Sequence, residues 1–167
     1  ADGTLATADV ADTASQPCYD ARGVTRMYEH LTSISTAMNT LGWSNYANDH
    51  EDGNGQFEQN FQFAEALTTA DRVITLRYLL SMIAADRGMI ATFMPKPFAD
   101  RTGSGMHLHM SLTSDGSATF PGDPASDGYG LGLSPTAYSF IAGVLDHACA
   151  LQAVVGPTVN SYKRTGA

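Results

Sequence analysis

Acidic side chains flank a short glycine-containing turn. His50, Glu51 and Asp52 precede this turn at residues 53–55, and Glu58 follows it. If the turn joins two neighbouring strands, Glu51 and Glu58 approach each other, and their repulsion requires a cation or a shared proton. Oxygen ligands of this kind favour Mg²⁺ or Mn²⁺. A solvated acidic hairpin and a paired-carboxylate glycosidase site are the alternatives that the spacing leaves open.

A second group of polar side chains lies in residues 105–113. His107, His109 and Ser111 alternate there with apolar residues. On a strand, alternate residues share a face, which places the two imidazoles roughly 6.5–7 Å apart. Such a pair binds zinc in some enzymes, or one ring holds a metal while the other contacts a substrate oxygen. Two half-exposed histidines without a role are the alternative interpretation.

Several of the few cations stand near these residues. Lys96 and Arg101 lie in the loop before the histidines, beside Gly103 and Gly105, which allow close backbone approach to a bound group. The spacing matches neither a Walker A motif nor a dinucleotide fingerprint, and it indicates a small-anion site. Arg164 and the lysine before it add two cations near the end of the sequence. A basic tail without a function is the alternative there.

Apolar periodicity predicts three helices around these segments. Spacings of three and four residues predict helices over residues 24–41, 65–87 and 134–156. The third begins with Ser-Pro, a favourable N-cap followed by proline in the first helical position. Residues 1–23 and 115–132 are rich in small, polar, glycine or proline residues, and they are predicted to be irregular.

Alternating polar and apolar residues predict strands between the helices. Residues 56–63 and 105–113 both alternate strictly, which is typical of strands with one face on a core. The polar face of these strands carries the candidate ligands named above. We therefore expect an α+β fold, in which a curved antiparallel sheet carries the active site on its polar face and helices pack outside.

Length, charge and composition limit the class of protein. The 167 residues include 17 acidic and 9 basic side chains, for a net charge of -8, and 43% are hydrophobic. This composition argues against disorder and against a nucleic-acid-binding surface, and the apolar runs are too short to cross a membrane. Cys18 and Cys149 are too few for a disulfide framework, which is typical of reduced thiols in a cytoplasmic protein.

Taken together, five segments of the sequence resemble the catalytic domain of the glutamine synthetase family. The segments occur in the order of the family, and the similarity as a whole runs from about Cys18 to Arg164. The segments are His50-Glu51, Gly55-Gln56-Phe57-Glu58, Met94-Pro95-Lys96-Pro97, Gly103-Ser104-Gly105-Met106-His107-Leu108-His109-Met110-Ser111-Leu112 and Asn160-Ser161-Tyr162-Lys163-Arg164. Residues 17–20, 48–52 and 91–101 are most similar to the branch called type III glutamate–ammonia ligases, which includes glutamate–methylamine ligases.

The resemblance implies roles for the candidate metal and nucleotide ligands. Glu51 and Glu58 match family glutamates that hold the metal on the substrate side. His107 matches the histidine on a second metal, which bridges the phosphates of ATP. His109 and Ser111 match positions that touch ATP or the reacting phosphoryl group.

The resemblance also implies contacts to the substrates. Phe63 matches an aromatic position near the adenine ring, and Gly103 matches a loop glycine that contacts glutamate. Arg164 matches a catalytic arginine that binds the glutamate carboxylate. Thr102 stands where the family usually has an asparagine, which departs from the family pattern for binding the glutamate amino group.

The implied activity is ATP-dependent ligation of ammonia or methylamine to the γ-carboxylate of glutamate. It proceeds through γ-glutamyl phosphate with Mg²⁺ or Mn²⁺, in a cytoplasmic, ring-forming homo-oligomer without nucleic-acid or membrane partners. A γ-glutamyl-polyamine ligase is an alternative within the same core chemistry. A non-enzymatic relative with a structural or regulatory role, and a metal-dependent hydrolase that uses the two histidines, are alternatives from other classes.

Several parts of the family pattern have no counterpart in these residues. They are the amino-terminal β-grasp domain, a Glu-x-Glu strand that completes the metal sites, and the later arginines and glutamates. We therefore expect residues 1–167 to be part of a single catalytic domain, within a subunit of roughly 400 residues or more. Half of the metal ligands and little activity are expected of these residues alone.

Overall fold

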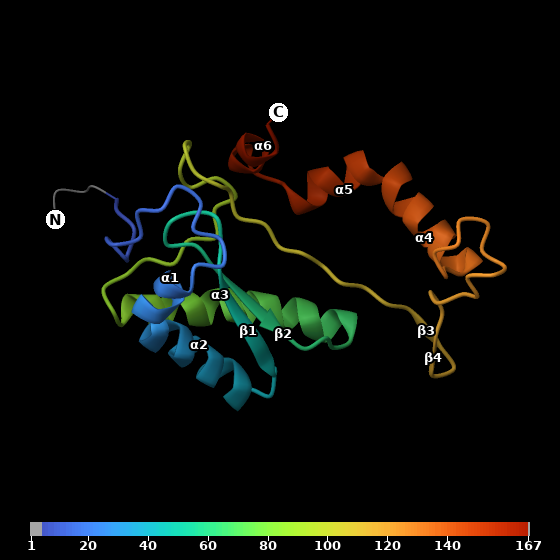
Figure 1. The fold of residues 1–167 in the computed structure, drawn as a ribbon, viewed down its shortest axis with the longest axis horizontal. Helices are drawn as coiled ribbons and strands as arrows, with labels where there is room; N and C mark the ends of the chain where they lie inside the picture. Colours follow the sequence, from blue (N-terminus) through green and yellow to red (C-terminus); the bar gives the residue numbers. More distant parts are fainter. Residues whose placement is uncertain (1–4, 167) are drawn as a thin grey trace. The chain divides into compact units, whose positions relative to one another are not determined.

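A computed structural model describes residues 5–166 and divides the chain into two compact units (Figure 1). The first unit ends at Ser104 and the second begins at Gly105. The elements of the first unit are α1 (Ala21–Arg26), α2 (Tyr28–Thr40), β1 (Asn45–His50), β2 (Phe57–Phe61) and α3 (Ala66–Ala85). Those of the second are β3 (Thr113–Ser114), β4 (Ser117–Ala118), α4 (Pro135–Asp146), α5 (Ala148–Val155) and α6 (Val159–Thr165).

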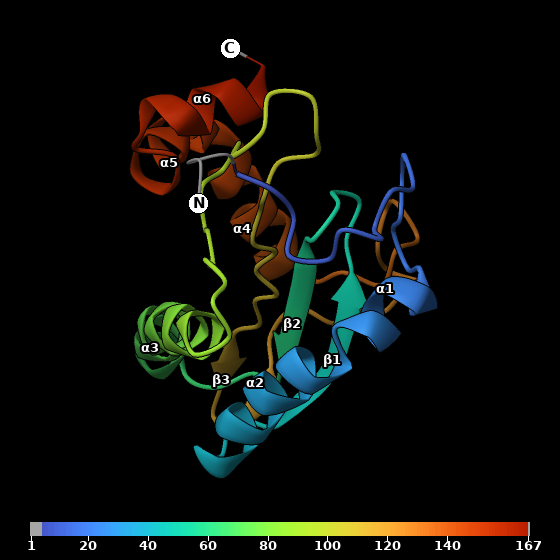
Figure 2. The ribbon, with the colours of Figure 1, turned by 90° about the vertical axis from the view of Figure 1, so that its left-hand side faces the viewer.

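Strands β1 and β2 form an antiparallel hairpin in the first unit. Asp49 lies opposite Glu58, and His50 lies opposite Phe57. Because side chains alternate between the faces of a strand, the two acidic residues share one face while His50 and Phe57 share the other. Helices α1 and α2 lie along the hairpin (Figure 2). The alternation predicted for this segment is confirmed.

The core of the first unit forms where α2, α3 and the hairpin meet. Ile34, Met38, Trp43 and Leu76 are buried together, and Phe61 of β2 packs against them. The ring centroids of Trp43 and Phe61 are 6.3 Å apart. The apolar face of the hairpin is thus fixed to two helices.

The first predicted helix is divided at Met27 into α1 and α2, so the prediction of one helix is corrected. Backbone hydrogen bonds still run through the division, because the N–H of Met27 donates to Gly23 and its carbonyl accepts from Leu31. Gly23 of α1 lies against β1, because a Cβ atom at this position would stand only 2.2 Å from the His50 ring. Helix α1 is therefore seated on β1, whereas α2 follows the core.

The second predicted helix is confirmed as α3. The carboxylate of Glu65 caps it by accepting from the N–H groups of Leu67 and Thr68. These hydrogen bonds lower the pKa of Glu65, as expected for an anion at a helix N-terminus.

The strand predicted over residues 105–113 is wrong for all but its last residue. Residues 102–112 lie outside any helix or strand, and only Thr113 and Ser114 pair, with β4. The turn of this short hairpin has Asp115 and Gly116 at φ values of 49° and 78°, as a tight two-residue hairpin requires. An alternating pattern specifies which face is apolar, but a strand also needs a neighbouring strand to receive its hydrogen bonds.

The third predicted helix is present as two helices, α4 and α5, whose axes differ by 67°. Ser134 caps α4 by accepting from the N–H of Ala137, as its Ser-Pro start predicts. The division falls at His147, which has φ of -97° and ψ of 10°. No single helix among residues 5–166 is long and apolar enough to cross a membrane. Helices α4 and α5 together have the length and composition of one broken membrane span.

Helix α6 has no counterpart among the predicted helices. It begins at a capping box, in which Thr158 and Ser161 exchange hydrogen bonds between side chain and backbone. It ends at Gly166, which has φ of 78° and closes the helix in the left-handed conformation. The basic segment that carries Arg164 is therefore helical and not an irregular tail.

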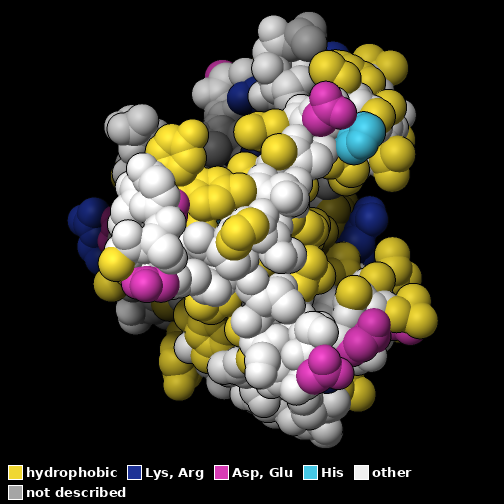
Figure 3. Space-filling view, turned by 90° about the vertical axis from the view of Figure 1, so that its right-hand side faces the viewer, with side chains coloured by type: hydrophobic (Ala, Val, Ile, Leu, Met, Phe, Trp, Pro, Cys, Tyr) yellow, Lys and Arg dark blue, Asp and Glu magenta, His cyan; other side chains and the backbone are white. Residues whose placement is uncertain are grey.

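Apolar side chains of the second unit are widely exposed. Helix α5 has no buried residue, and Val154 and Val155 are 75% and 70% exposed. Figure 3 shows hydrophobic side chains spread across one face of the chain among fewer charged ones.

Candidate functional site

The predicted carboxylates lie on the polar face of the β1–β2 hairpin. The N–H of Glu51 donates to the carbonyl of Gln56 at 2.9 Å, which continues the pairing one step beyond His50. Asp49 and Glu51 of one side of the hairpin therefore share a face with Glu58 of the other side. Glu51 and Glu58 are both half-buried. The expectation that the glycine-containing turn joins neighbouring strands is confirmed.

Negative charge is concentrated around this end of the hairpin. Partial loss of contact with water raises the pKa of the Cys18 thiol. The negative charges of four nearby carboxylates raise this pKa further, namely those of Glu51, Asp52, Asp49 and Glu58. The charges of four carboxylates thus all influence the Cys18 thiol. Carboxylate oxygens of this kind are ligands that Mg²⁺ and Mn²⁺ prefer.

The loop that carries Gly103 is hydrogen-bonded to the same hairpin. The side-chain amide of Gln56 donates to the carbonyl of Gly103 at 3.1 Å and to the Ser104 hydroxyl at 3.4 Å. The hydroxyl of Thr102 donates to the Asp52 carboxylate at 2.7 Å. The structure therefore brings the candidate metal ligands and the candidate glutamate-contacting glycine together, although about 45 residues separate them.

The cations of this loop help to fix its shape. The ammonium group of Lys96 donates to the carbonyl of Arg101, and the Arg101 guanidinium lies 4.9 Å from the centroid of the Phe98 ring. The N–H of Ser104 donates to the carbonyl of Pro95 at 2.8 Å. Nη1 of Arg101 is buried and has no hydrogen-bond partner among the described residues. Lys96 and Arg101 are thus held close to Gly103 by contacts within the loop.

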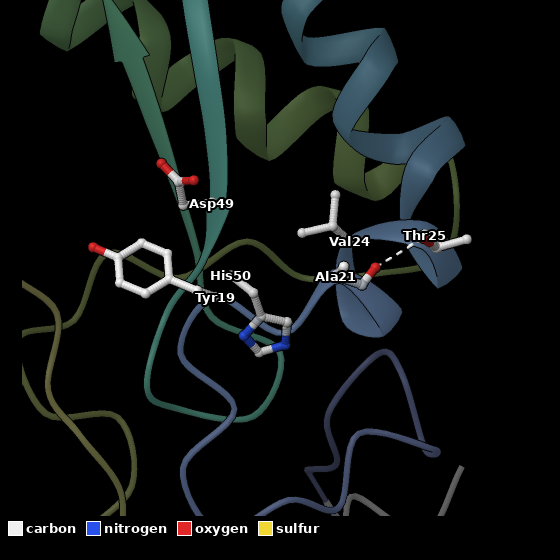
Figure 4. Close-up of a pocket in the computed structure, with 6 residues that line it drawn as sticks. All are labelled: Tyr19, Ala21, Val24, Thr25, Asp49 and His50. Carbon is white, nitrogen blue, oxygen red and sulfur yellow. Dashed lines mark hydrogen bonds between the residues drawn. The ribbon is translucent and has the colours of Figure 1, made fainter.

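A small pocket opens beside the hairpin, next to α1. It has a volume of about 310 Å³ and is lined by Tyr19, Ala21, Val24, Thr25, Asp49 and His50. Figure 4 shows Tyr19 and Asp49 on one side of the pocket and the α1 residues on the other. Tyr19 has φ of 60°, and its N–H donates to the carbonyl of His50 at 2.8 Å. No sequence pattern had indicated this pocket.

A buried carboxylate–imidazole pair, which no sequence pattern predicted, lies next to the hairpin. Nε2 of His50 lies 2.9 Å from the carboxylate of Asp12, and His50 is completely buried. Burial raises the pKa of Asp12, but hydrogen bonds from Gly55 and Asn54, together with His50, outweigh it, so that its pKa is lowered. Asp12 is therefore an ionised carboxylate inside the protein. Because 38 residues separate the partners, no local spacing could reveal the pair.

The second unit contains the remaining candidate residues. His107, His109 and Ser111 are exposed side chains of the extended segment before β3. Arg164 lies in the last turn of α6, and its Nη2 atom would be 2.5 Å from a Cβ atom on Gly105. Phe63, by contrast, belongs to the first unit, where it follows β2 and is 87% exposed.

Within residues 5–166, no three His, Cys, Asp or Glu side chains are arranged so that they could hold a metal ion. Glu51 and Glu58 fit the chemistry of a hard cation as two of its oxygen ligands. Further ligands would have to be added to this pair. His107 stays a predicted metal ligand of the second unit.

Comparison with protein families matches residues 4–167 to the glutamine synthetase catalytic domain. The glutamate–methylamine ligase of Methyloversatilis universalis is 47% identical over 163 residues, which cover 98% of this chain and 36% of the relative. The glutamine synthetase of Rhizobium meliloti is 44% identical over 160 residues, which cover 95% of this chain and 36% of the relative. The chain thus spans only about a third of the length of these relatives.

Solved structures show the same fold. A structure of GmaS in complex with ADP matches with a TM-score of 0.88 at 50% identity, and the match covers 96% of this chain and 36% of that chain. The glutamine synthetase of Plasmodium falciparum, determined by cryo-electron microscopy, matches with a TM-score of 0.76 at 31% identity over 81% of this chain and 26% of that chain. The predicted α+β fold class is confirmed.

Proposed function

The chain belongs to the family of glutamine synthetase catalytic domains, and from this premise we propose that the protein is an ATP-dependent carbon–nitrogen ligase. The proposed reaction joins ammonia or methylamine to the γ-carboxylate of glutamate through γ-glutamyl phosphate. Relatives named glutamine synthetase and glutamate–methylamine ligase support this class of reaction. Because both names occur at similar identity, the proposal covers both amines.

The hydrogen bonds from Gln56 are the observation that carries this proposal. They join the acidic face of the hairpin to the loop of Gly103. Two acidic substrates, ATP and glutamate, can meet only where their charges are neutralised and their reacting groups are aligned. A carboxylate pair for a cation and a substrate-contacting loop, held together by one side chain, meet both needs.

We assign the metal-binding roles to three residues. Glu51 and Glu58 would hold a Mg²⁺ or Mn²⁺ ion on the glutamate side, and His107 would hold a second ion. When bound, these cations neutralise phosphate and carboxylate oxygens, including the charge that develops during phosphoryl transfer.

The remaining candidate residues orient the substrates. Arg164 is proposed to bind the glutamate carboxylate, since a guanidinium pairs with it in a fixed, two-point geometry. The backbone of Gly103 would contact the same substrate. His109, Ser111 and Phe63 are proposed to contact ATP at its phosphates and its adenine ring.

The exposed apolar surface supports a proposal about assembly. Soluble proteins rarely leave whole helix faces such as that of α5 uncovered, and extensive exposure is typical of surfaces that other protein covers. We propose that residues 1–167 are part of a single catalytic domain in a ring-forming homo-oligomer of the cytoplasm.

Product analysis tests the proposed reaction. The protein at its natural length is incubated with glutamate, ATP and Mg²⁺, together with either ammonium or methylamine, and the products are identified by mass spectrometry. Glutamine or γ-glutamylmethylamide is expected, with one phosphate released per amide. The Glu58→Ala variant serves as the control that should form neither amide. Hydrolysis of ATP without any amide, or no ATP-dependent product, would contradict the proposal.

A further inference from the structure

A buried carboxylate lies directly behind the proposed metal hairpin. Asp12 is 6% exposed, and its Oδ2 atom is 2.9 Å from Nε2 of the fully buried His50. The other ring nitrogen of His50, Nδ1, is 2.6 Å from the backbone carbonyl oxygen of Glu51. Each ring nitrogen of His50 therefore lies within hydrogen-bond distance of an oxygen atom. The ring thereby links Asp12 to the main chain of a proposed metal ligand.

The same carboxylate also holds the far side of the turn. The N–H of Gly55 donates to Oδ2 of Asp12 at 2.7 Å. The Asn54 side chain donates to Oδ1 at 3.3 Å and to the carbonyl of Ala14 at 2.9 Å. The Asp12 carboxylate therefore contacts His50, which directly precedes Glu51, and also Asn54 and Gly55 of the turn.

The imidazole in this link has little room to move. On one side it faces Gly23 of α1, where a Cβ atom would be only 2.2 Å from Cδ2 of His50. On the other side the Phe57 ring lies at a centroid distance of 4.7 Å in an edge-on arrangement. Because the ring is packed against a helix and a strand, it has little freedom to rotate, and it keeps Asp12 at a fixed distance from the main chain of Glu51.

We propose that Asp12, acting through His50 and the turn, is a positioning residue that sets the spacing of Glu51 and Glu58 for a divalent cation. This inference rests on the proposed function, because it concerns the cation that these two glutamates would hold. Groups that orient metal ligands without touching the metal commonly change metal affinity by about 10- to 100-fold when they are replaced.

Binding of Mn²⁺ to the protein at its natural length tests the inference. Affinity is measured from the electron paramagnetic resonance signal of free Mn²⁺, and the spectrum of bound Mn²⁺ reports the ligand geometry. The Asp12→Asn variant keeps the size of the side chain but removes its charge, and we expect it to bind Mn²⁺ about tenfold more weakly, with an altered bound spectrum.

Asp9→Asn is the matched control. Asp9 is also a buried carboxylate of this segment, at 9% exposure, but it pairs with Arg26, and among the described residues its side chain has no hydrogen bond to the turn. Its replacement should lower the melting temperature without changing Mn²⁺ affinity or the bound spectrum. Equal weakening in both variants would overturn the inference, because it would reduce the effect of Asp12 to general stability. Unchanged Mn²⁺ affinity in a folded Asp12→Asn protein would overturn it as well.

A milder variant decides the question if Asp12→Asn does not fold. Asn54→Ala removes only one of the contacts to the carboxylate, and a smaller loss of Mn²⁺ affinity is expected. Unchanged affinity in that variant would overturn the inference. A wild-type protein that binds no Mn²⁺ would overturn the proposed metal site itself, which separates failure of the proposed function from failure of the positioning role.

Discussion

Arg164 shows how a single glycine can determine where a functional side chain lies. Its guanidinium occupies the space that a side chain on Gly105 would fill, since Nη2 would be 2.5 Å from the added Cβ. The obstructed atom is the end of a long flexible side chain, which can move aside at little cost in stability. Movement of the Arg164 guanidinium would instead weaken the proposed binding of glutamate, because an arginine pairs with a carboxylate in a fixed geometry.

We therefore expect Gly105→Ala to raise the KM for glutamate about tenfold or more, which is the scale of one weakened charge-assisted contact, while the melting temperature stays unchanged. Steady-state kinetics with varied glutamate and saturating ATP measure this effect. Gly143→Ala is the matched control, because a Cβ atom on Gly143 of α4 would have no atom within 4 Å. An unchanged KM in the Gly105→Ala protein would contradict the role of Arg164.

Glu58 offers a second prediction at the same scale. Removing one of two carboxylate ligands in Glu58→Ala should weaken Mn²⁺ binding by at least the 10- to 100-fold that indirect contacts already cause, or about 1.4 to 2.7 kcal/mol. Glu29→Ala, which removes an exposed glutamate of α2, should leave Mn²⁺ binding unchanged. Calorimetric titration of both variants with Mn²⁺ checks the prediction, which fails if the two behave alike.

Individual elements depend on polar contacts that their own sequences supply. Asp127 organises the loop before α4, because its carboxylate accepts from the N–H groups of Tyr129, Leu131 and Leu133 and from the hydroxyl of Tyr138. The N–H of Tyr129 is the largest favourable influence, and together these donors lower the pKa of Asp127 to about 2, from an ordinary value of 3.8. Burial and the hydrogen bond to Asp127 raise the pKa of Tyr138 to about 12.

The depressed pKa of Asp127 predicts acid sensitivity of this loop. Above pH 3.8 the carboxylate is ionised in both folded and unfolded chains, and its stabilising contribution is fully present. As the pH falls from 3.8 toward 2, the unfolded chain takes up the proton first, and the contribution is lost. Hydrogen exchange of the Leu131 and Leu133 amides, corrected for the intrinsic effect of pH, should show protection that disappears over this range. Asp127→Asn should show little protection at either end of it.

Helices and hairpin of the first unit depend instead on one shared core. Met38 of α2 is completely buried beside Trp43 and Leu76. Met38→Ala should lower the free energy of unfolding by about 2–5 kcal/mol through lost burial and a residual cavity. Met82→Ala, on the 47% exposed Met82 of α3, should have a much smaller effect. Denaturant unfolding followed by the fluorescence of Trp43 measures both changes.

Local patterns explain which elements could be predicted from the sequence. Helix α3 has its cap at Glu65, and the hairpin has a turn between alternating residues, so each carries its own signal. Residues 105–112 carry the same alternation but have no paired strand in the described structure. Helix α6 is too short for a clear apolar period, and its capping box pairs Thr158 with Ser161 in place of the Glu or Gln of the usual sequence signature. The Asp12–His50 pair depends on the fold alone, because neither residue has a neighbour in sequence that points to the other.

The whole molecule combines an acidic surface with locally placed cations. A net charge of -8 repels ATP and glutamate at long range, while the proposed sites place metal ions and Arg164 where these anions would bind. Much apolar surface remains exposed in the 167 residues, and the relatives are nearly three times as long. This exposure is the observation behind the proposed assembly with other protein.

The proposed assembly predicts the behaviour of the 167 residues by themselves. Glutamate-dependent release of phosphate from ATP should stay at background, because two of the metal ligands alone bind a cation weakly. The protein at its natural length, assayed at equal molar concentration, is the control. Turnover by the 167 residues at a rate comparable to that control would show that these residues form a sufficient active site.

The link from Asp12 to the hairpin also bears on where the protein can be cut without loss. A shortened version that starts at α1, with Ala21, keeps every helix, every strand and every proposed ligand named above. It would nevertheless lack the carboxylate that contacts both His50 and the turn between Glu51 and Glu58. A domain boundary drawn from secondary structure alone would remove a residue proposed to position the metal ligands, while every proposed ligand stayed in place.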